Sequence, residues 1–204
     1  MDMCKALTTE VEKIICSGNI YTKKKAALAA TRIIRKVPKL AEQYISQIQY
    51  LLKERNHGVF LSTLSLINVI ITTDPKLCKK FKNHLTIMLK VQKNLVGSYS
   101  AEFDIAGVFD PFLQVGIISF FKLMGENNEE ISEELVEILA SIATNMTSTK
   151  NSGCAVLYEC VRTIMAIESS KSLRSFGISI LGKFLAIKDN NSRYVSLQSL
   201  KQVV

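Results

Sequence analysis

Cysteine and histidine are the residue types in this chain that could serve as nucleophile, general base or metal ligand. The two histidines, His57 and His84, lie far apart in the sequence. Neither has a partner at the i+3 or i+4 spacing that places two metal ligands on one helical turn. The cysteines form no C-x-x-C pair, and their odd number is typical of reduced thiols in the cytosol. They are Cys4, Cys16, Cys78, Cys154 and Cys160. No metal site and no cofactor are therefore predicted.

The chain carries no motif of a known catalytic centre. It lacks the G-x-S-x-G nucleophile turn, the phosphate-binding loop of nucleotide hydrolases and the G-x-G-x-x-G dinucleotide fingerprint. Cys154 and Cys160 fall in a segment with an apolar helical stripe, which favours small buried hydrophobic residues over reactive thiols. A Cys–His nucleophile stays open as an alternative, because its partners need to be close only in space. We predict that the chain is not an enzyme, and we assign no catalytic residue.

Positive charge is the third chemical feature, and it is unevenly distributed. The formal net charge is +8 at pH 7. Residues 23–39 are crowded with Lys and Arg, a second basic run follows at residues 76–82, and residues 126–137 are acidic. A solvated helix face is the more common role of such a run. If the early segment instead meets an anionic surface, its candidate contacts are Lys23, Lys24, Lys25, Arg32 and Lys36.

An anionic membrane, a nucleic acid or an acidic protein are the partners that suit such a basic segment. Its first three lysines begin a predicted helix, where the helix dipole disfavours cations, and this misfit favours an anionic partner. The chain has no Trp and no aromatic residue interleaved with its lysine runs, so nucleic acid is not expected. A helical-repeat protein that binds anionic membrane or nucleic acid through Lys23–Lys39 remains an alternative.

The elements that must position these residues are helices. Apolar residues make up 48% of the 204 residues, and 9 Gly and 3 Pro are too few for the turns of a sandwich or barrel. Four segments place a small residue between two apolar ones, which lets a neighbouring helix approach closely. They are Ala26-Ala27-Leu28, Val115-Gly116-Ile117, Phe176-Gly177-Ile178 and Val195-Ser196-Leu197. This repetition predicts an all-α fold, an α-solenoid of armadillo/HEAT-like helical repeats.

Apolar periodicity and capping residues predict the helices one by one. The expected starts and stripes are residues 2–16, residues 21–36, Pro38 with Leu40-Tyr44-Ile48-Leu51, residues 58–73, Asp74-Pro75 to Leu95, Asp110-Pro111 onward, Glu129 onward, Leu157-Val161-Ile164, Leu173-Phe176-Ile180-Phe184, and Asn191 to Val204. Residues 58–73 are uncharged but too short to span a membrane, so we expect a fully buried helix. Residues 97–110 are expected to be irregular, with Tyr99, Phe103 and Phe109 packed against the protein.

Several stretches resemble the large adaptins of clathrin adaptor complexes, in order along the whole chain. Residues 104–115, D-I-A-G-V-F-D-P-F-L-Q-V, resemble the adaptin segment D-x-x-G-x-x-D-P-F-L-Q-V. Further similar stretches are residues 3–5, 10–13, 24–28, 34–38, 155–159, 163–165, 180–185 and 189–195. The Thr-Ile-Met and Ile-Leu-Gly-x-Phe-Leu sequences are most similar to those of the gamma-adaptin branch. The epsilon-type and alpha-type trunks rank second and third.

The resemblance implies a binding scaffold of a heterotetrameric clathrin adaptor complex in vesicle-mediated transport between the trans-Golgi network and endosomes. Its implied partners are a small sigma subunit, and a beta-type large adaptin and a medium mu subunit in the full complex. Through the complete protein they include an Arf-family GTPase and clathrin. The implied location is cytoplasmic, peripheral on trans-Golgi network and endosomal membranes and on clathrin-coated vesicles. Gly116 differs from the residue that animal gamma sequences have at this position. No ligand-contacting residue of the family is assigned to this chain.

The last predicted helix ends without a cap, with Leu197, Leu200 and Val204 on one face. Terminal repeats of a solenoid are usually atypical and polar on their outer side. We therefore expect residues 1–204 to be a single excised segment of an adaptin N-terminal trunk, without hinge or ear domain.

Overall fold

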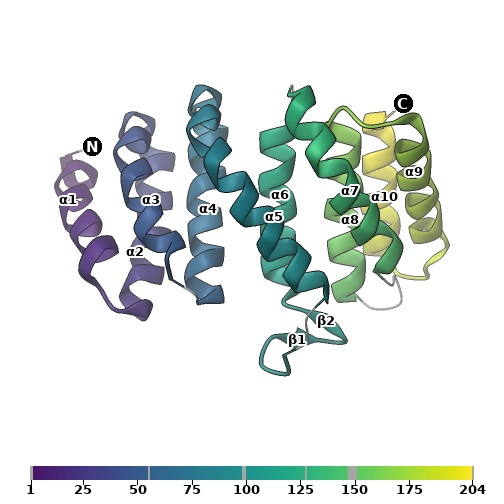
Figure 1. Ribbon diagram of the computed structural model, residues 1–204, viewed down its shortest axis with the longest axis horizontal. Coiled ribbons are helices and arrows are strands. Elements are labelled where there is room, and N and C mark those ends of the chain that lie inside the picture. The colour runs from purple at the N-terminus through teal and green to yellow at the C-terminus, as the bar shows by residue number, and fades with distance from the viewer. Residues whose placement is uncertain (1, 55, 98–99, 127, 147–150, 204) are drawn as a thin grey trace. The chain divides into compact units, whose positions relative to one another are not determined.

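The computed structural model describes residues 2–54, 56–97, 100–126, 128–146 and 151–203, and nearly all of them are helical (Figure 1). The chain forms two compact units, unit 1 (Met1–His84) and unit 2 (Leu85–Val204). The predicted all-α class of helical repeats is confirmed. No helix of the described residues is both long enough and apolar enough to cross a lipid bilayer.

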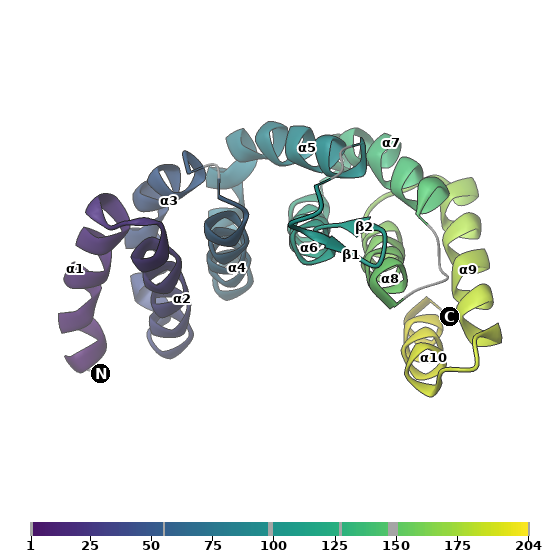
Figure 2. The same cartoon turned by 90° about the horizontal axis from the view of Figure 1, so that it is seen from below.

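Unit 1 is built from antiparallel helices in two layers. Its elements are α1 (Asp2–Ser17), α2 (Ile20–Lys36), the 3-10 helix η1 (Pro38–Tyr44), α3 (Ile45–Leu52), α4 (His57–Thr73) and the 3-10 helix η2 (Pro75–Phe81). Helices α2 and α4 pack against each other, while α1 packs on α2 and α3 packs on α4. Figure 2 shows α2 and α4 side by side in one layer. Asn19 and Asn56 cap this pair, because their side chains accept hydrogen bonds from the backbone N–H of Thr22 (2.9 Å) and Val59 (3.1 Å).

The core of unit 1 is centred on α4, which was expected to be fully buried; nine of its 17 residues are buried, while Val69 is half-buried and Thr72 is exposed. Phe60, Leu64, Ile67 and Ile71 are buried as predicted. The facing side of α2 offers Ala26 and Ala30, whose small side chains let the two helices approach closely. Buried hydroxyls are satisfied within their own helices, as where Thr63 Oγ1 donates to the carbonyl of Val59 at 2.8 Å.

The two proline-led helices of unit 1 begin differently from the prediction. The helices expected from Pro38 and Pro75 start as 3-10 turns, with i to i+3 bonds such as Leu40 N to Val37 O (3.1 Å) and Leu77 N to Asp74 O (3.0 Å). 3-10 turns are common at helix N-termini, although each of these stretches, with seven residues, is longer than usual. The predicted stripe Leu40-Tyr44-Ile48-Leu51 is nevertheless buried throughout.

Unit 2 repeats the two-layer arrangement. It contains most of α5 (Lys82–Gly97), then β1 (Asp104–Ile105), β2 (Val108–Phe109), α6 (Pro111–Gly125), α7 (Glu129–Asn145), α8 (Asn151–Ala166), α9 (Lys171–Ala186) and α10 (Asn190–Val203). Helix α8 is central and packs on α6, α7 and α9, and α10 packs on α9. In Figure 2, α7 and α9 lie in one layer, and α6, α8 and α10 lie in the other.

The stretch expected to be irregular contains a small antiparallel hairpin, which the sequence did not predict. Asp104 pairs with Phe109 and Ile105 with Val108, and the turn residues Ala106 and Gly107 both have positive φ (57° and 84°). Such a turn matches the twist of a two-residue hairpin. Phe103 and Phe109 are half-buried with ring centroids 6.4 Å apart, which confirms that they pack down. Tyr99 lies outside the described residues.

The D-P-F-L-Q-V segment organises the start of α6. Asp110 lies in the left-handed region (φ 38°), which Asp tolerates better than most residues, and its Oδ1 accepts the N–H of Leu113 at 3.0 Å. Pro111 occupies the first turn, where no backbone donor is needed. Gln114 is buried and donates to the carbonyl of Phe109 (2.7 Å) while accepting from Gln92 of α5 (3.2 Å). The motif thus ties the hairpin and α5 to α6.

Two predicted apolar stripes in unit 2 are partly wrong. In α9, Leu173, Ile180 and Phe184 are buried, but Phe176 is 37% exposed. In α10, Leu197 is 57% exposed, whereas Ser196 and Ser199 are buried; Val204 lies outside the described residues. Consecutive residues of a helix differ by about 100° in direction, so the small residue faces the neighbour while its flanking residues point sideways.

Candidate functional site

The cysteines with catalytic potential are held in a form that opposes reaction. Cys160 is fully buried, its Sγ donates to the carbonyl of Leu139 at 3.4 Å, and burial raises its pKa to about 12. The thiol is therefore protonated at neutral pH and is a poor nucleophile. Its predicted role as a small buried hydrophobic residue is confirmed. Cys154 is half-buried rather than buried, and burial also raises its pKa.

The histidines and carboxylates form no metal centre among the residues that the structure describes. His84 lies beside the ring of Phe81, with centroids 6.0 Å apart, and burial lowers its pKa. His57 is the first residue of α4. Neither His57 nor His84 belongs to a group of three or more possible metal ligands among the described residues.

The two units differ sharply in formal charge. Unit 1 contains 15 of the 26 Lys and Arg residues and 6 of the 18 Asp and Glu residues, so its formal charge is +9. Unit 2 contains the other 11 basic and 12 acidic residues, so its formal charge is −1. The basic character of the chain therefore belongs to unit 1.

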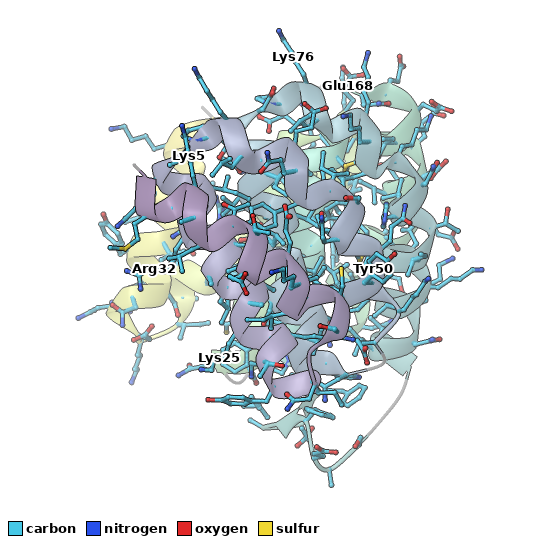
Figure 3. The ribbon with its side chains drawn as sticks, turned by 90° about the vertical axis from the view of Figure 1, so that its left-hand side faces the viewer. Lys5, Lys25, Arg32, Tyr50, Lys76 and Glu168 are labelled. Atoms are coloured by element: carbon cyan, nitrogen blue, oxygen red, sulfur yellow. The ribbon has the colours of Figure 1, made fainter. Side chains whose placement is uncertain are left out.

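Helix α2 brings three of the five candidate residues together. Lys25, Arg32 and Lys36 are exposed, and their spacing of seven and four residues places them on one side of the helix. The buried residues Ala26, Ala30 and Ile33 lie on the other side. Figure 3 labels Lys25 and Arg32 and shows both side chains at the surface of the molecule.

Lys23 and Lys24 do not belong to that group. The Lys23 ammonium forms an ion pair of 2.6 Å with Glu54, and its side chain is only 13% exposed. It lies on the side of α2 that faces the core, so it joins α2 to the end of α3 rather than to a ligand. Lys24 is exposed, and its ammonium lies close to Gly58 in the first turn of α4.

Two residues of this surface were missed by sequence reasoning. Tyr21 is 67% exposed and Leu28 is 39% exposed, and both share the face of Lys25, Arg32 and Lys36. The Lys25 ammonium lies 5.5 Å from the centre of the Tyr21 ring. The signal was present in the helical period, which places Tyr21, Leu28 and Arg32 in line. We call these five residues the α2 basic face: Tyr21, Lys25, Leu28, Arg32 and Lys36.

Two layers of packed helices in each unit, with a basic face on α2, define a helical-repeat protein. The family model described as "Adaptin N terminal region" matches residues 1–204, and the chain belongs to this family. The predicted resemblance to the large adaptins is thereby confirmed.

Curated relatives from distant organisms agree on the branch within the family. The chain is 48% identical over 203 residues to "AP-1 complex subunit gamma" of Dictyostelium discoideum, covering 99% of this chain and 23% of the relative. It is 42% identical to "AP-1 complex subunit gamma-1" of Arabidopsis thaliana and 42% identical to "AP-1 complex subunit gamma-like 2" of Homo sapiens. These alignments cover 100% of this chain and 23% and 26% of the relatives. The chain thus spans about a quarter of the length of these relatives.

Proposed function

We propose that this chain is a trunk segment of a gamma-type large subunit and acts as a scaffold in a heterotetrameric clathrin adaptor complex. The observation that carries the proposal is similarity along the whole chain, at 42% identity or more, to gamma subunits of AP-1 complexes from an amoeba, a plant and a human. The corresponding process is vesicle-mediated protein transport between the trans-Golgi network and endosomes.

Assembly is the activity that such a scaffold performs. Its partners would be a small sigma subunit, a beta-type large adaptin and a medium mu subunit, with clathrin and an Arf-family GTPase engaged by the complete protein. Stacked helices suit this role because each hairpin leaves a surface open beside the face it buries. The buried, protonated thiol of Cys160 supports a structural role over a catalytic one.

We further propose that the α2 basic face lies against an anionic membrane surface. Three exposed cations on one helix face, together with Tyr21 and Leu28, combine electrostatic attraction with side chains that suit the membrane interface. The formal charge of +9 on unit 1 supports the same contact with an anionic membrane. The protein would then be cytoplasmic and peripheral on trans-Golgi network, endosomal and coated-vesicle membranes.

Co-expression with the matching small sigma subunit tests the scaffold proposal. A stable one-to-one complex on size-exclusion chromatography is expected. Failure to co-elute, with both proteins folded by circular dichroism, would contradict the proposal that this segment holds the sigma subunit.

A further inference from the structure

A cavity of about 440 Å³ in unit 2 is lined by side chains of α6, α8, α9 and α10. Three of the lining residues are cations, each from a different helix: Lys122 of α6, Arg162 of α8 and Arg174 of α9. No carboxylate lines the cavity among the described residues. A concentration of cations is unexpected here, because unit 2 as a whole has a formal charge of −1.

The three cations differ in how far their charge is already compensated. Arg174 is held by neutral acceptors, the carbonyl of Ile167 (3.0 Å to Nη2) and Ser169 Oγ (3.3 Å to Nε). These bonds fix the guanidinium without cancelling its charge. The ammonium of Lys122 makes no hydrogen bond or ion pair with any described residue. Lys122 lies in the last turn of α6, where the helix dipole stabilises a cation without neutralising it.

Arg162 is the compensated member. Its Nη1 forms an ion pair of 2.9 Å with Glu159, a largely buried residue, and its guanidinium lies 5.7 Å from the ring of Tyr158. Three cations against one carboxylate leave an excess of about two positive charges around the cavity. A phosphomonoester at neutral pH, with about −1.5 to −2 charge, matches this excess better than a single carboxylate does.

Apart from Ser199 of α10, the remaining side chains that line the cavity are apolar. Val161 and Met165 of α8 and Ile178 of α9 form this wall. Gly177 allows α8 and α9 to approach closely enough to form it, since a Cβ there would lie 2.9 Å from Met165 Cε. A cavity of this size falls within the range of clefts that hold ligands, so there is room for an apolar group beside an anion.

We propose that this cavity binds a phosphorylated Ser or Thr side chain in a peptide segment of a partner protein. The phosphoryl oxygens lie between Lys122 and Arg174, where the planar guanidinium offers paired donors. An apolar side chain next to the phosphorylated residue packs on Met165 and Ile178. The net charge of −1 on unit 2 argues against a lipid headgroup, because an anionic bilayer does not attract this unit. The inference goes beyond the adaptor proposal and does not depend on it.

Fluorescence anisotropy tests this assignment on the full chain. The probe is a labelled five-residue peptide in which a phosphoserine stands between two leucines. The unphosphorylated peptide, soluble inositol phosphate and phosphoinositide-containing vesicles are measured in parallel. Lys122→Gln should weaken binding of the phosphopeptide about tenfold, as expected for loss of one charge-assisted hydrogen bond. Arg174→Lys, which keeps the charge but removes the fork, should weaken it less.

Lys183→Gln is the matched control, because Lys183 is exposed in the last turn of α9 and does not line the cavity. It changes the charge and the helix end in the same way, and it should leave binding unchanged. Equal binding of both peptides, equal loss in the control, or no binding of the phosphopeptide would overturn the proposal. Lys122-dependent binding of the inositol phosphate or the vesicles without binding of the peptide would overturn it as well.

Discussion

At the residue scale, neighbouring lysines of the same type have different roles. Lys23 and Lys25 are two positions apart, yet Lys23 is paired with Glu54 and largely buried while Lys25 is exposed. A helix turns by about 200° over two residues, which puts them on opposite sides. The helical period predicts that Lys23 and Lys25 lie on opposite sides of the helix. It does not predict Glu54 as the partner of Lys23, because Glu54 follows α3 and approaches only in the folded protein. Adjacency in sequence therefore overstated the size of the basic site.

Neutralising the exposed cations of the α2 basic face should weaken binding to anionic vesicles. The variant is Lys25→Gln, Arg32→Gln and Lys36→Gln in one chain. Each cation near an anionic membrane contributes about 1 kcal/mol, so the loss of three should lower the partition coefficient by about two orders of magnitude at low salt. Co-sedimentation with phosphatidylcholine vesicles, with and without phosphatidylserine, measures it.

A control of equal charge change is available in unit 2. Lys183, Lys188 and Lys201 are exposed, and their replacement by Gln should leave vesicle binding nearly unaltered. If the two triple variants lose binding equally, net charge rather than this helix face is responsible. If the α2 triple variant loses binding to an oligonucleotide while its binding to vesicles is unchanged, the nucleic-acid alternative is favoured.

Cys160 gives a pH dependence whose sign follows from its burial. The folded thiol has a pKa of about 12, above its ordinary value of 9.0, so the unfolded chain releases the proton first. Its contribution to stability is therefore complete below pH 9.0 and is lost progressively as pH rises toward 12. The difference in unfolding free energy between the wild type and Cys160→Ala, measured in urea, should shrink over that range. A difference that is constant with pH would contradict the buried, protonated thiol.

At the element scale, capping chemistry and apolar period were enough to place the helices. Asp110 and Asn128 cap α6 and α7 by accepting hydrogen bonds from the backbone N–H of Leu113 and Ile131, and the two helices begin at Pro111 and Glu129, as expected. The central helix α4 was also predictable, because it carries no Asp, Glu, Lys or Arg and has a continuous apolar stripe. These signals are local, so a single sequence contains them.

Features set by neighbouring elements were not predictable in the same way. The hairpin at residues 104–109 depends on two adjacent residues with positive φ, one of them Ala106, which has no preference for that region. The exposure of Phe176 and Leu197 depends on which side of α9 and α10 meets a partner helix. The small residue between apolar ones does mark the contact, as Gly177 shows, although the flanking residues lie beside it.

Glycine substitutions test this packing. At Gly182, in the exposed part of α9, an added Cβ meets nothing within 4 Å, so Gly182→Ala should raise the unfolding free energy by about 0.5–1 kcal/mol through backbone entropy. At Gly125, a Cβ would lie 2.8 Å from Ile167 Cγ2 and 3.1 Å from Leu135 Cδ1. Gly125→Ala should therefore cost about 1–3 kcal/mol. Urea unfolding measures both, and equal effects would contradict the close approach at Gly125.

At the scale of the whole molecule, charge and cavities are divided between the two units. Unit 1 is strongly basic and offers an exposed helix face, whereas unit 2 is close to neutral and gathers three cations around one cavity. A scaffold that assembles several partners needs distinct surfaces of this kind. Such surfaces arise from the spatial grouping of ordinary residues, so composition alone indicated a basic protein but not where it would act.

If this chain is a gamma-type adaptin trunk segment, as we propose, it should select the matching small subunit. The most direct test is parallel co-purification with the small sigma subunit of the gamma-containing complex and with that of the alpha-containing complex, each expressed at the same level. We predict a one-to-one complex with the first and little or none with the second. Equal retention of both, or preference for the alpha-type partner, would contradict the assignment to the gamma branch.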